Sequence, residues 1–305
     1  MPLQLLIDTW SKFFFSEVSC ATIVVWRILT GCLLLLNALF LLPLIPDYFS
    51  EDGLWPTAAW LNHQKSSRFS LLVLMPPSTR SFRVLLLIHA VASFWFLIGF
   101  QFRISAALVF LTLVSIHHRN AYILSSGDTL LRLLIFYSCF SNAGGGLSVD
   151  HYLAGSPLST FQKMDAWPMR LMQLQICVVY LRTVYWKLRG RMWWDGTAAW
   201  YPLWVDAYVR FRPPEYLLRP FWVRLATWGT LVAELALGSI IWIREFRYPL
   251  IVSGMALHLI LEVIMNLQLF SWIMMVSLLL FCFPSDTEHW LKVILQYCGA
   301  ISLVP

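Results

Sequence analysis

Long apolar runs recur along almost the whole of this 305-residue sequence, and they limit the kinds of fold that the chain can adopt. The hydrocarbon core of a bilayer is about 30 Å thick, which a helix of about 20 apolar residues can cross. Within that core every backbone polar group must be hydrogen-bonded inside its own segment, which favours helices. The candidate spans are residues 21–45, 84–100, 104–116, 129–140, 169–188, 221–243, 248–265 and 270–283. The sequence therefore predicts an all-α, polytopic transmembrane helical bundle of about seven or eight spans, since the run at 129–140 is short.

The composition leaves little material for a soluble domain. Only 12% of the residues are charged, whereas soluble domains carry about 25%. We therefore expect residues 1–305 to form a single membrane-embedded domain. Residues 1–20 alternate apolar side chains with Asp8, Lys12 and Glu17, a pattern typical of a helix lying in the membrane interface. Residues 21–284 are predicted to form the helical bundle, and residues 285–305 a C-terminal tail.

The charge and the cysteines narrow the classes of partner. The net charge is +6, but the basic residues fall in loops between apolar runs, and no basic domain carries them. We therefore expect membrane lipids, and no nucleic acid, as partners. The six cysteines form no close pair, so they predict neither a disulfide framework nor a metal site. The chain is expected to be an integral membrane protein, of the cell or inner membrane if its source is bacterial.

Several ionisable residues lie within or at the edge of the apolar runs: Arg27, His89, Asp128, Arg132, Arg182, Lys187, Glu234, His258 and Glu262. Each such residue costs roughly 2.5–3.5 kcal/mol at mid-bilayer, so the set predicts a shared polar interior with internal pairing. Asp128 and Arg132 are four residues apart, as are His258 and Glu262, and each pair therefore shares one helical face. Arg27 could pair with Glu234 across helices. His258 with Glu262 could relay a proton, but the two form only half of a di-metal motif, and no metal is predicted.

Lys187 differs from the other ionisable residues in its position. It ends a predicted span and precedes the Trp-rich segment Trp193-Trp194-Asp195-Gly196. A lysine held in a partly dry pocket can act as a general base, because desolvation disfavours the ammonium form. Alternatively, Lys187 could extend its side chain past the membrane boundary into water. Position alone does not decide between these two alternatives.

Four stretches in fixed order resemble a known family. The strongest is Lys187-Leu188 followed by Trp193-Trp194-Asp195-Gly196, preceded by Val179-Tyr180-Leu181. The others are residues 48–54, residues 118–120, and residues 265–270 with 281–284. Together they resemble the horizontally transferred transmembrane domain family, to which the membrane domain of vitamin K-dependent gamma-carboxylase belongs.

The resemblance implies an enzyme that uses a lysine general base on a quinone or another lipid-soluble substrate. Lys187 matches the lysine that deprotonates reduced vitamin K, so reduced vitamin K or another quinone is the implied cofactor, and the implied activity is of a carboxylase or epoxidase type (a lyase or an oxidoreductase). A separate soluble protein would then dock a protein substrate. The residues expected around the substrate are Trp193, Trp194, Asp195, Gly196, Arg182, Asn266 and Asn120.

A second hypothesis comes from a different functional class. Buried charges also occur in membrane carriers and in assembly proteins that bind a partner helix. Many transporters are built from two related halves with broken helices. The sequence contains no such internal repeat. This favours the enzyme over a non-enzymatic carrier or partner-binding protein.

Overall fold

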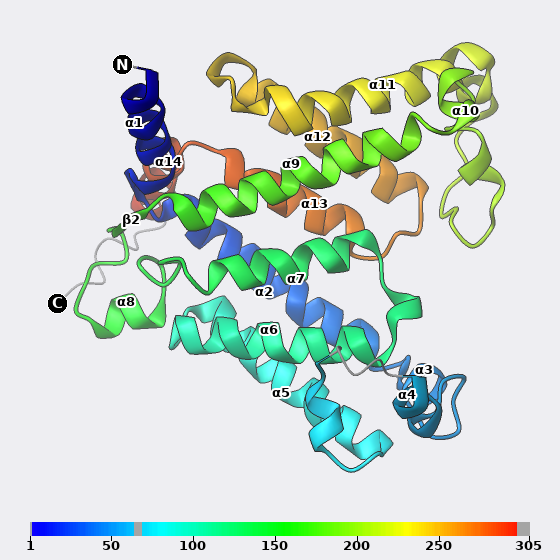
Figure 1. The fold of residues 1–305 in the computed structure, drawn as a ribbon, viewed down its shortest axis with the longest axis horizontal. Coiled ribbons are helices and arrows are strands. Elements are labelled where there is room, and N and C mark those ends of the chain that lie inside the picture. Colours follow the sequence, from blue (N-terminus) through cyan, green and yellow to red (C-terminus); the bar gives the residue numbers. More distant parts are fainter. Residues whose placement is uncertain (1, 64–68, 298–305) are drawn as a thin grey trace. The chain divides into compact units, whose positions relative to one another are not determined.

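The computed structural model describes residues 2–63 and 69–297, and helices joined by loops make up most of these residues. One antiparallel pair of short strands is present, β1 (Glu17–Ser19) and β2 (Lys163–Asp165), in which Val18 is opposite Met164. The all-α prediction is therefore confirmed, and the sequence did not reveal this small sheet. The chain divides into two compact units, residues 1–172 with 283–305, and residues 173–282. Figure 1 shows the helices of both units. That the chain forms a single membrane-embedded domain stays a prediction.

The first unit contains four main helices, and each of them packs against the next one along the chain. They are α2 (Ala21–Leu41), α5 (Thr79–Ile98), α6 (Phe102–Arg119) and α7 (Ser126–Ser138). Helices α2 and α5 pack together, as do α5 and α6, and α6 and α7. Gly31 permits the first of these contacts, since a Cβ there would lie 2.7 Å from the Cα atom of Leu97.

Shorter elements complete the first unit. The helices are α1 (Pro2–Phe15), α3 (Ile45–Tyr48), α4 (Thr57–His63), η1 (Leu71–Leu74), η2 (Ala121–Ile123), α8 (Val149–Leu153), the start of α9 (Trp167–Lys187) and α14 (Pro284–Tyr297). Helix α1 lies within the predicted interfacial segment, and α14 occupies most of the predicted tail. The last part of that tail, residues 298–305, lies outside the described residues.

Arg27 is the most deeply buried charge of the first unit, with no exposed surface. Its guanidinium donates to the carbonyl oxygens of Ala143 and Leu147, at 2.7 and 2.5 Å, and so binds the loop between α7 and α8. The predicted pairing of Arg27 with Glu234 is therefore wrong. Two backbone carbonyls accept from the terminal nitrogens of this guanidinium, which a pattern of charged side chains alone could not reveal.

Asp128 also has a different partner from the predicted one. Its carboxylate accepts from the backbone N–H and the hydroxyl of Ser125, at 2.7 and 2.8 Å, and forms a capping box at the start of α7. Asp128 therefore caps its own helix and does not form the predicted ion pair with Arg132. A carboxylate in the first turn of a helix commonly accepts from the backbone N–H of the residue that caps the helix. His89 binds the hydroxyl of Thr112 through Nδ1 at 2.8 Å, as expected of a packing histidine.

The second unit is built on four helices. They are the remainder of α9, α11 (Pro220–Ser239), α12 (Arg244–Ile264) and α13 (Phe270–Leu278). Short elements join them: α10 (Arg191–Trp194), η3 (Tyr201–Trp204), η4 (Glu215–Leu218), η5 (Ile240–Trp242) and η6 (Leu279–Phe281). Gly238 brings α11 against α9, since a Cβ at Gly238 would lie 2.8 Å from Cγ of Leu181.

The helices coincide with the predicted runs, but fewer of them meet the requirements of a membrane span. Four are long and apolar enough: α2, α5, α11 with η5, and α12. The count rises to five if α13 with η6 and α14 are taken as one broken span. Helix α7 has only 13 residues, and α9 carries Arg170, Arg182 and Lys187. The structure therefore supports four or five spans, and the predicted count of seven or eight is not confirmed.

Candidate functional site

The candidate site begins on one face of α9. Tyr180 and Lys187 are seven residues apart, which is close to two helical turns, so both side chains lie on the same face. Tyr180 is buried, and the side chain of Lys187 is only 18% exposed. A lysine that reached past the membrane boundary would have its ammonium group in water. Here the ammonium instead points into the second unit.

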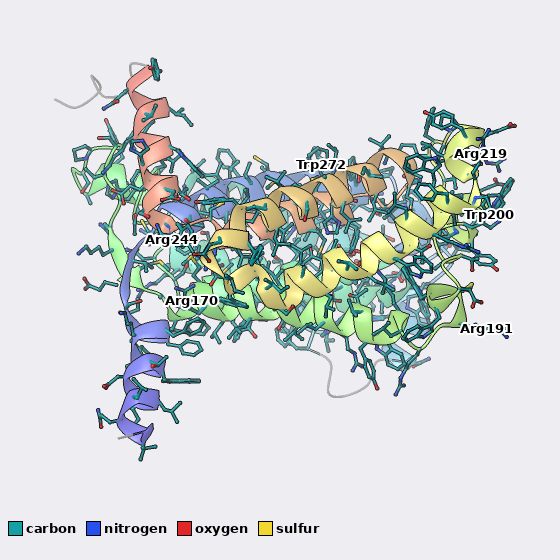
Figure 2. All side chains as sticks on the ribbon, turned by 90° about the horizontal axis from the view of Figure 1, so that it is seen from above. Arg170, Arg191, Trp200, Arg219, Arg244 and Trp272 are labelled. Carbon is teal, nitrogen blue, oxygen red and sulfur yellow. The ribbon has the colours of Figure 1, made fainter. Side chains whose placement is uncertain are left out.

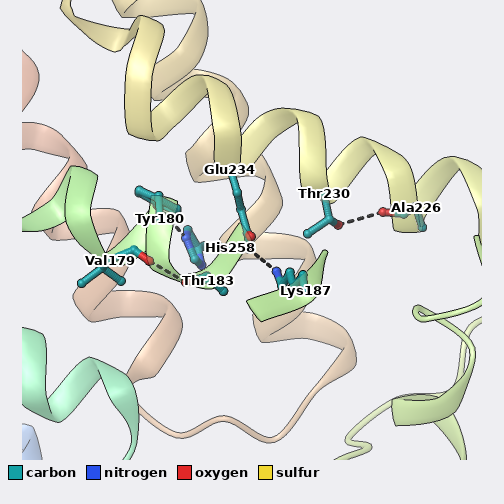
Figure 3. A network of polar contacts seen from close by, with 8 residues as sticks. All are labelled: Val179, Tyr180, Thr183, Lys187, Ala226, Thr230, Glu234 and His258. Carbon is teal, nitrogen blue, oxygen red and sulfur yellow. Dashed lines mark hydrogen bonds and ion pairs between the residues drawn. The ribbon is translucent and has the colours of Figure 1, made fainter. Parts of the chain in front are cut away.

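Lys187 forms an ion pair with Glu234 of α11. The distance from Nζ of Lys187 to Oε1 of Glu234 is 2.5 Å, and the Glu234 side chain is 11% exposed (Figure 3). The indole of Trp193 lies against the same ammonium group, with Nζ 4.7 Å from the ring centroid. A carboxylate and an aromatic face thus both stabilise a positive charge at Lys187. Glu234 takes this partner in place of the predicted Arg27.

A second polar contact lies beside this ion pair. The hydroxyl of Tyr180 and Nε2 of His258 in α12 are 3.0 Å apart, and Figure 3 shows this pair next to Lys187 and Glu234. His258 also packs edge-on against Phe270, with the ring centroids 5.9 Å apart. Three helices, α9, α11 and α12, therefore bring four polar side chains together within the second unit.

The expected partnership of His258 with Glu262 is wrong. Glu262 lies one turn further along α12 and accepts from the guanidinium of Arg210 at 3.1 Å. Both residues lie on the buried face of α12, as their spacing predicts, but each meets a different neighbouring segment. No cluster of three or more His, Cys, Asp or Glu side chains that could hold a metal occurs within residues 2–63 and 69–297.

Three buried atoms of these side chains have no hydrogen-bond partner: Oε2 of Glu234, Nδ1 of His258 and Oε2 of Glu262. A buried polar atom without a partner costs roughly 1–3 kcal/mol, so such atoms are uncommon in folded proteins. The two carboxylate oxygens can accept a hydrogen bond, and the histidine nitrogen can donate or accept according to its tautomer. These atoms give the cluster unused capacity to bind a polar group.

The Trp-rich segment after α9 is fixed against α11. The indole of Trp228 donates to the carbonyl oxygen of Trp193 at 3.1 Å, and the indole of Trp194 donates to that of Leu188 at 2.7 Å. Asp195 is exposed and pairs with Arg191 at 3.5 Å. Trp193 contacts the ammonium group of Lys187 through its ring face.

The other predicted site residues lie elsewhere. Arg182 is exposed on α9 and stacks on Tyr185 and Trp186. Asn266 is exposed, and its backbone N–H donates to the carbonyl oxygen of Tyr208 at 2.8 Å. Asn120 belongs to the first unit, where its side-chain oxygen accepts from the backbone of Tyr122. A substrate-binding role of these residues stays a prediction.

Two of the stretches that carried the family resemblance meet in the first unit. The guanidinium of Arg119 donates to the carbonyl oxygen of Trp55 at 2.8 Å, and the indole of Trp60 donates to that of His118 at 2.9 Å. The side chain of Asn120 reaches the carbonyl oxygen of Tyr48 at 3.5 Å. The loop after α2 and the end of α6 therefore form one packed structure, although they are about 60 residues apart in sequence.

Comparison with known families places the chain in one of them. The model of the HTTM domain matches residues 15–286, which is most of the chain. The chain belongs to the HTTM domain family. This is the domain found in vitamin K-dependent gamma-carboxylase, so the resemblance predicted from the four stretches is confirmed.

More specific relatives add little about this HTTM protein. The uncharacterized protein YitO of Bacillus subtilis is 27% identical to it over 123 residues. That alignment covers 38% of this chain and 40% of YitO, so it spans less than half of either protein. No solved structure matches the chain.

A substitution at Gly196 tests how closely the Trp-rich segment of the HTTM protein packs against α11. This glycine has φ of +73°, and a Cβ there would lie 2.8 Å from Cγ of Arg224 and 3.0 Å from the ring of Trp228. Gly196→Ala is expected to lower the free energy of unfolding by about 2–4 kcal/mol, from backbone strain and from overpacking together.

Gly155→Ala is the matched control for this substitution. Gly155 has nearly the same φ, +72°, but nothing lies within 4 Å of its added Cβ. Its replacement should therefore cost only the backbone term, about 1 kcal/mol. Unfolding of the three proteins in mild detergent measures the difference. Equal losses for the two variants would show that residue 196 tolerates a side chain.

Proposed function

We propose that this HTTM protein is a membrane-embedded enzyme in which Lys187 acts as a general base on a lipid-soluble substrate. The ion pair of Lys187 with Glu234, enclosed by α9, α11 and α12, is the observation that carries the proposal. The family resemblance implies that Lys187 is a base. The carboxylate of Glu234 can accept the proton that Lys187 must lose before it can act as one.

The proposed chemistry begins with the proton that the two side chains share. In a dry site two opposite charges are costly, and the neutral form of the pair becomes accessible when the proton moves from Nζ of Lys187 to Glu234. The free amine of Lys187 then takes a proton from an acidic hydroxyl of the substrate. The resulting ammonium pairs with the substrate anion, while Glu234 keeps the first proton. No proton is created or lost in these two steps.

The substrate that we propose is a reduced quinone. The atoms without partners fit its two hydroxyl groups, because Oε2 of Glu234 can accept a hydrogen bond and Nδ1 of His258 can accept or donate one. The indole of Trp193 offers an aromatic face beside Lys187. An apolar ring system with an isoprenoid tail would reach such a site from within the bilayer, through the apolar outer surfaces of the helices.

Further parts of the proposal concern the membrane. We propose that α6, α7 and α9 cross or enter the membrane with the more apolar helices, which would give the seven or eight spans expected from the sequence. The membrane would be the cell or inner membrane if the source is bacterial. Carboxylation of a protein substrate would need a separate soluble docking protein, and this part of the proposal follows from the family resemblance alone.

The experiment is an assay of the purified protein in liposomes with a reduced naphthoquinone and O2. In the reaction, one oxygen atom enters the quinone as an epoxide and the other leaves as water, so the hydroquinone is oxidised and O2 is reduced. Chromatography of the lipid extract should show epoxide that depends on the protein and is absent with Lys187→Met. If neither protein forms epoxide from any reduced quinone, although both bind it equally, the enzyme hypothesis fails and the carrier or partner-binding hypothesis replaces it.

A further inference from the structure

The outer face of α9 carries a second feature that the proposed reaction does not use. Arg182, Tyr185, Trp186 and Arg189 follow one another at helical spacing along the end of α9 and just beyond it, and all four are exposed. We call these four residues the arginine–aromatic stripe. Tyr180, Val184 and Lys187 lie on the buried or partly buried face of the same helix. The stripe therefore points away from the Lys187–Glu234 pair.

Both arginines of the stripe stack on the same two rings. The guanidinium carbon of Arg182 is 5.1 Å from the ring centroid of Trp186 and 5.9 Å from that of Tyr185. The guanidinium carbon of Arg189 is 5.0 and 4.5 Å from the same two centroids. Cation–π contacts hold guanidinium groups in place while leaving their N–H groups free to bind an anion. The same two rings thus hold both guanidinium groups in place on the outer face of α9.

Neither arginine has a carboxylate partner among the described residues. Arg212 provides the contrast, because it also stacks on a ring, that of Trp204 at 5.4 Å, but pairs with Asp206 at 2.8 Å. Two like charges held against the same rings repel each other, and this repulsion is relieved when an anion binds to both. The stripe therefore has the charge and the hydrogen-bond donors of a phosphate site.

The surroundings of the stripe are those of a membrane interface. Exposed Leu181 and Leu188 flank it, and exposed Met192 and Trp194 follow it. The end of the second unit that follows it is rich in arginine and tryptophan, and Figure 2 shows Arg191, Trp200 and Arg219 gathered there, with Arg244 at the opposite end of that unit. Tryptophan and arginine together are typical of the headgroup region, where a phosphate and the start of an acyl chain lie side by side.

We propose that the arginine–aromatic stripe binds the phosphate group of an anionic phospholipid. Arg182 and Arg189 donate to the phosphate, and the neighbouring leucines contact the first part of the acyl chains. The apolar flanks favour a lipid over an acidic peptide, since a water-soluble peptide gains nothing from exposed Leu181 and Leu188. The proposal does not depend on the reaction at Lys187.

Titration of the full-length protein in detergent with a short-chain phosphatidylglycerol tests the proposal, with bound lipid counted by native mass spectrometry. One basic residue near an anionic surface contributes about 1 kcal/mol, which corresponds to about fivefold in affinity. Arg182→Gln and Arg189→Gln should each weaken binding about fivefold, and the double variant more than either. Arg212→Gln is the matched control and should leave the affinity unchanged.

Competition with other ligands shows whether the stripe binds a phospholipid, free phosphate or an acidic peptide. Phosphatidylcholine and inorganic phosphate should bind at least tenfold more weakly than phosphatidylglycerol, the first because its headgroup is neutral and the second because it has no acyl chain. The thermal midpoints of the variants should equal that of the wild type, since all of these side chains are exposed. Equal affinity for inorganic phosphate, displacement of the lipid by a polyglutamate peptide, or an equal loss in the Arg212→Gln control would each overturn the proposal.

Discussion

Replacing Lys187 with arginine is expected to reduce turnover about a thousandfold while leaving the fold intact. An arginine can still pair with Glu234, because a guanidinium forms strong bonds with carboxylates. It cannot act as a base, since it keeps its proton at any workable pH. The size of the loss follows from general acid–base catalysis, which contributes 10²- to 10⁴-fold, or roughly 10³. The rate of epoxide formation and the thermal unfolding midpoint in detergent measure the two parts of this prediction.

Lys187→Ala is a less selective test than Lys187→Arg, because it also removes the partner of a buried carboxylate. Glu234 would lose its ion-pair partner in a site where its side chain is only 11% exposed. Removing one member of such a pair costs about 3–5 kcal/mol at full burial, so roughly 3 kcal/mol is expected here. The double variant Lys187→Met with Glu234→Gln should recover most of this loss and remain inactive. Full turnover by Lys187→Arg would instead show that charge, and not basicity, matters at this position.

Arg210→Gln is expected to destabilise the protein by about 3 kcal/mol, whereas Glu262→Gln should cost less than about 1 kcal/mol. The two residues form one ion pair, but their side chains are 47% and 10% exposed, respectively. Loss of Arg210 leaves a buried carboxylate with neither oxygen bonded, because Oε2 of Glu262 already has no partner. Loss of the Glu262 charge leaves an arginine that water can reach.

Unfolding in mild detergent compares the two single variants with the double variant Arg210→Gln with Glu262→Gln. The double variant should be nearly as stable as Glu262→Gln alone, because no charge remains buried. Arg212→Gln is again a suitable control, since Arg212 is 56% exposed and its partner Asp206 is 90% exposed. Equal losses for the two single variants would mean that Glu262 finds another partner when Arg210 is gone.

The sequence predicted the helices well because apolar runs of helical length have few alternatives in a membrane protein. Helices lie at all eight predicted runs, from α2 to α13 with η6. The number of spans was predicted less well, because α9 carries Arg170, Arg182 and Lys187. Its 21 residues are long enough for a span, but its composition keeps it out of the apolar candidates, while its buried residues Tyr180 and Val184 belong to the packed interior of the second unit.

The pairing of charges was predicted less well than the helices. Helical spacing placed His258 and Glu262 on one buried face, and that part was right. It did not reveal that Tyr180 and Arg210 would supply their partners, from α9 and from a loop 52 residues away from Glu262. Periodicity determines which way a side chain points, whereas its partner depends on tertiary packing. Two signals in the sequence could have added Tyr180 to the site: its spacing of seven from Lys187, and its place in the stretch Val179-Tyr180-Leu181 that carries the family resemblance.

The spacing of seven residues between Tyr180 and Lys187 also means that the site extends along the axis of α9. Seven residues of helix rise about 10 Å, which is roughly a third of the hydrocarbon core of a bilayer. If α9 runs across the membrane, Lys187 lies near the level of the headgroups, and the helix backbone at Tyr180 lies about 10 Å further in. A bound molecule would then meet Lys187 at the end of the cluster that is closer to water, and His258 at the end that is further from it. Hydration along α9 would thus separate the place where a molecule is recruited from the place where a reactive anion is sheltered.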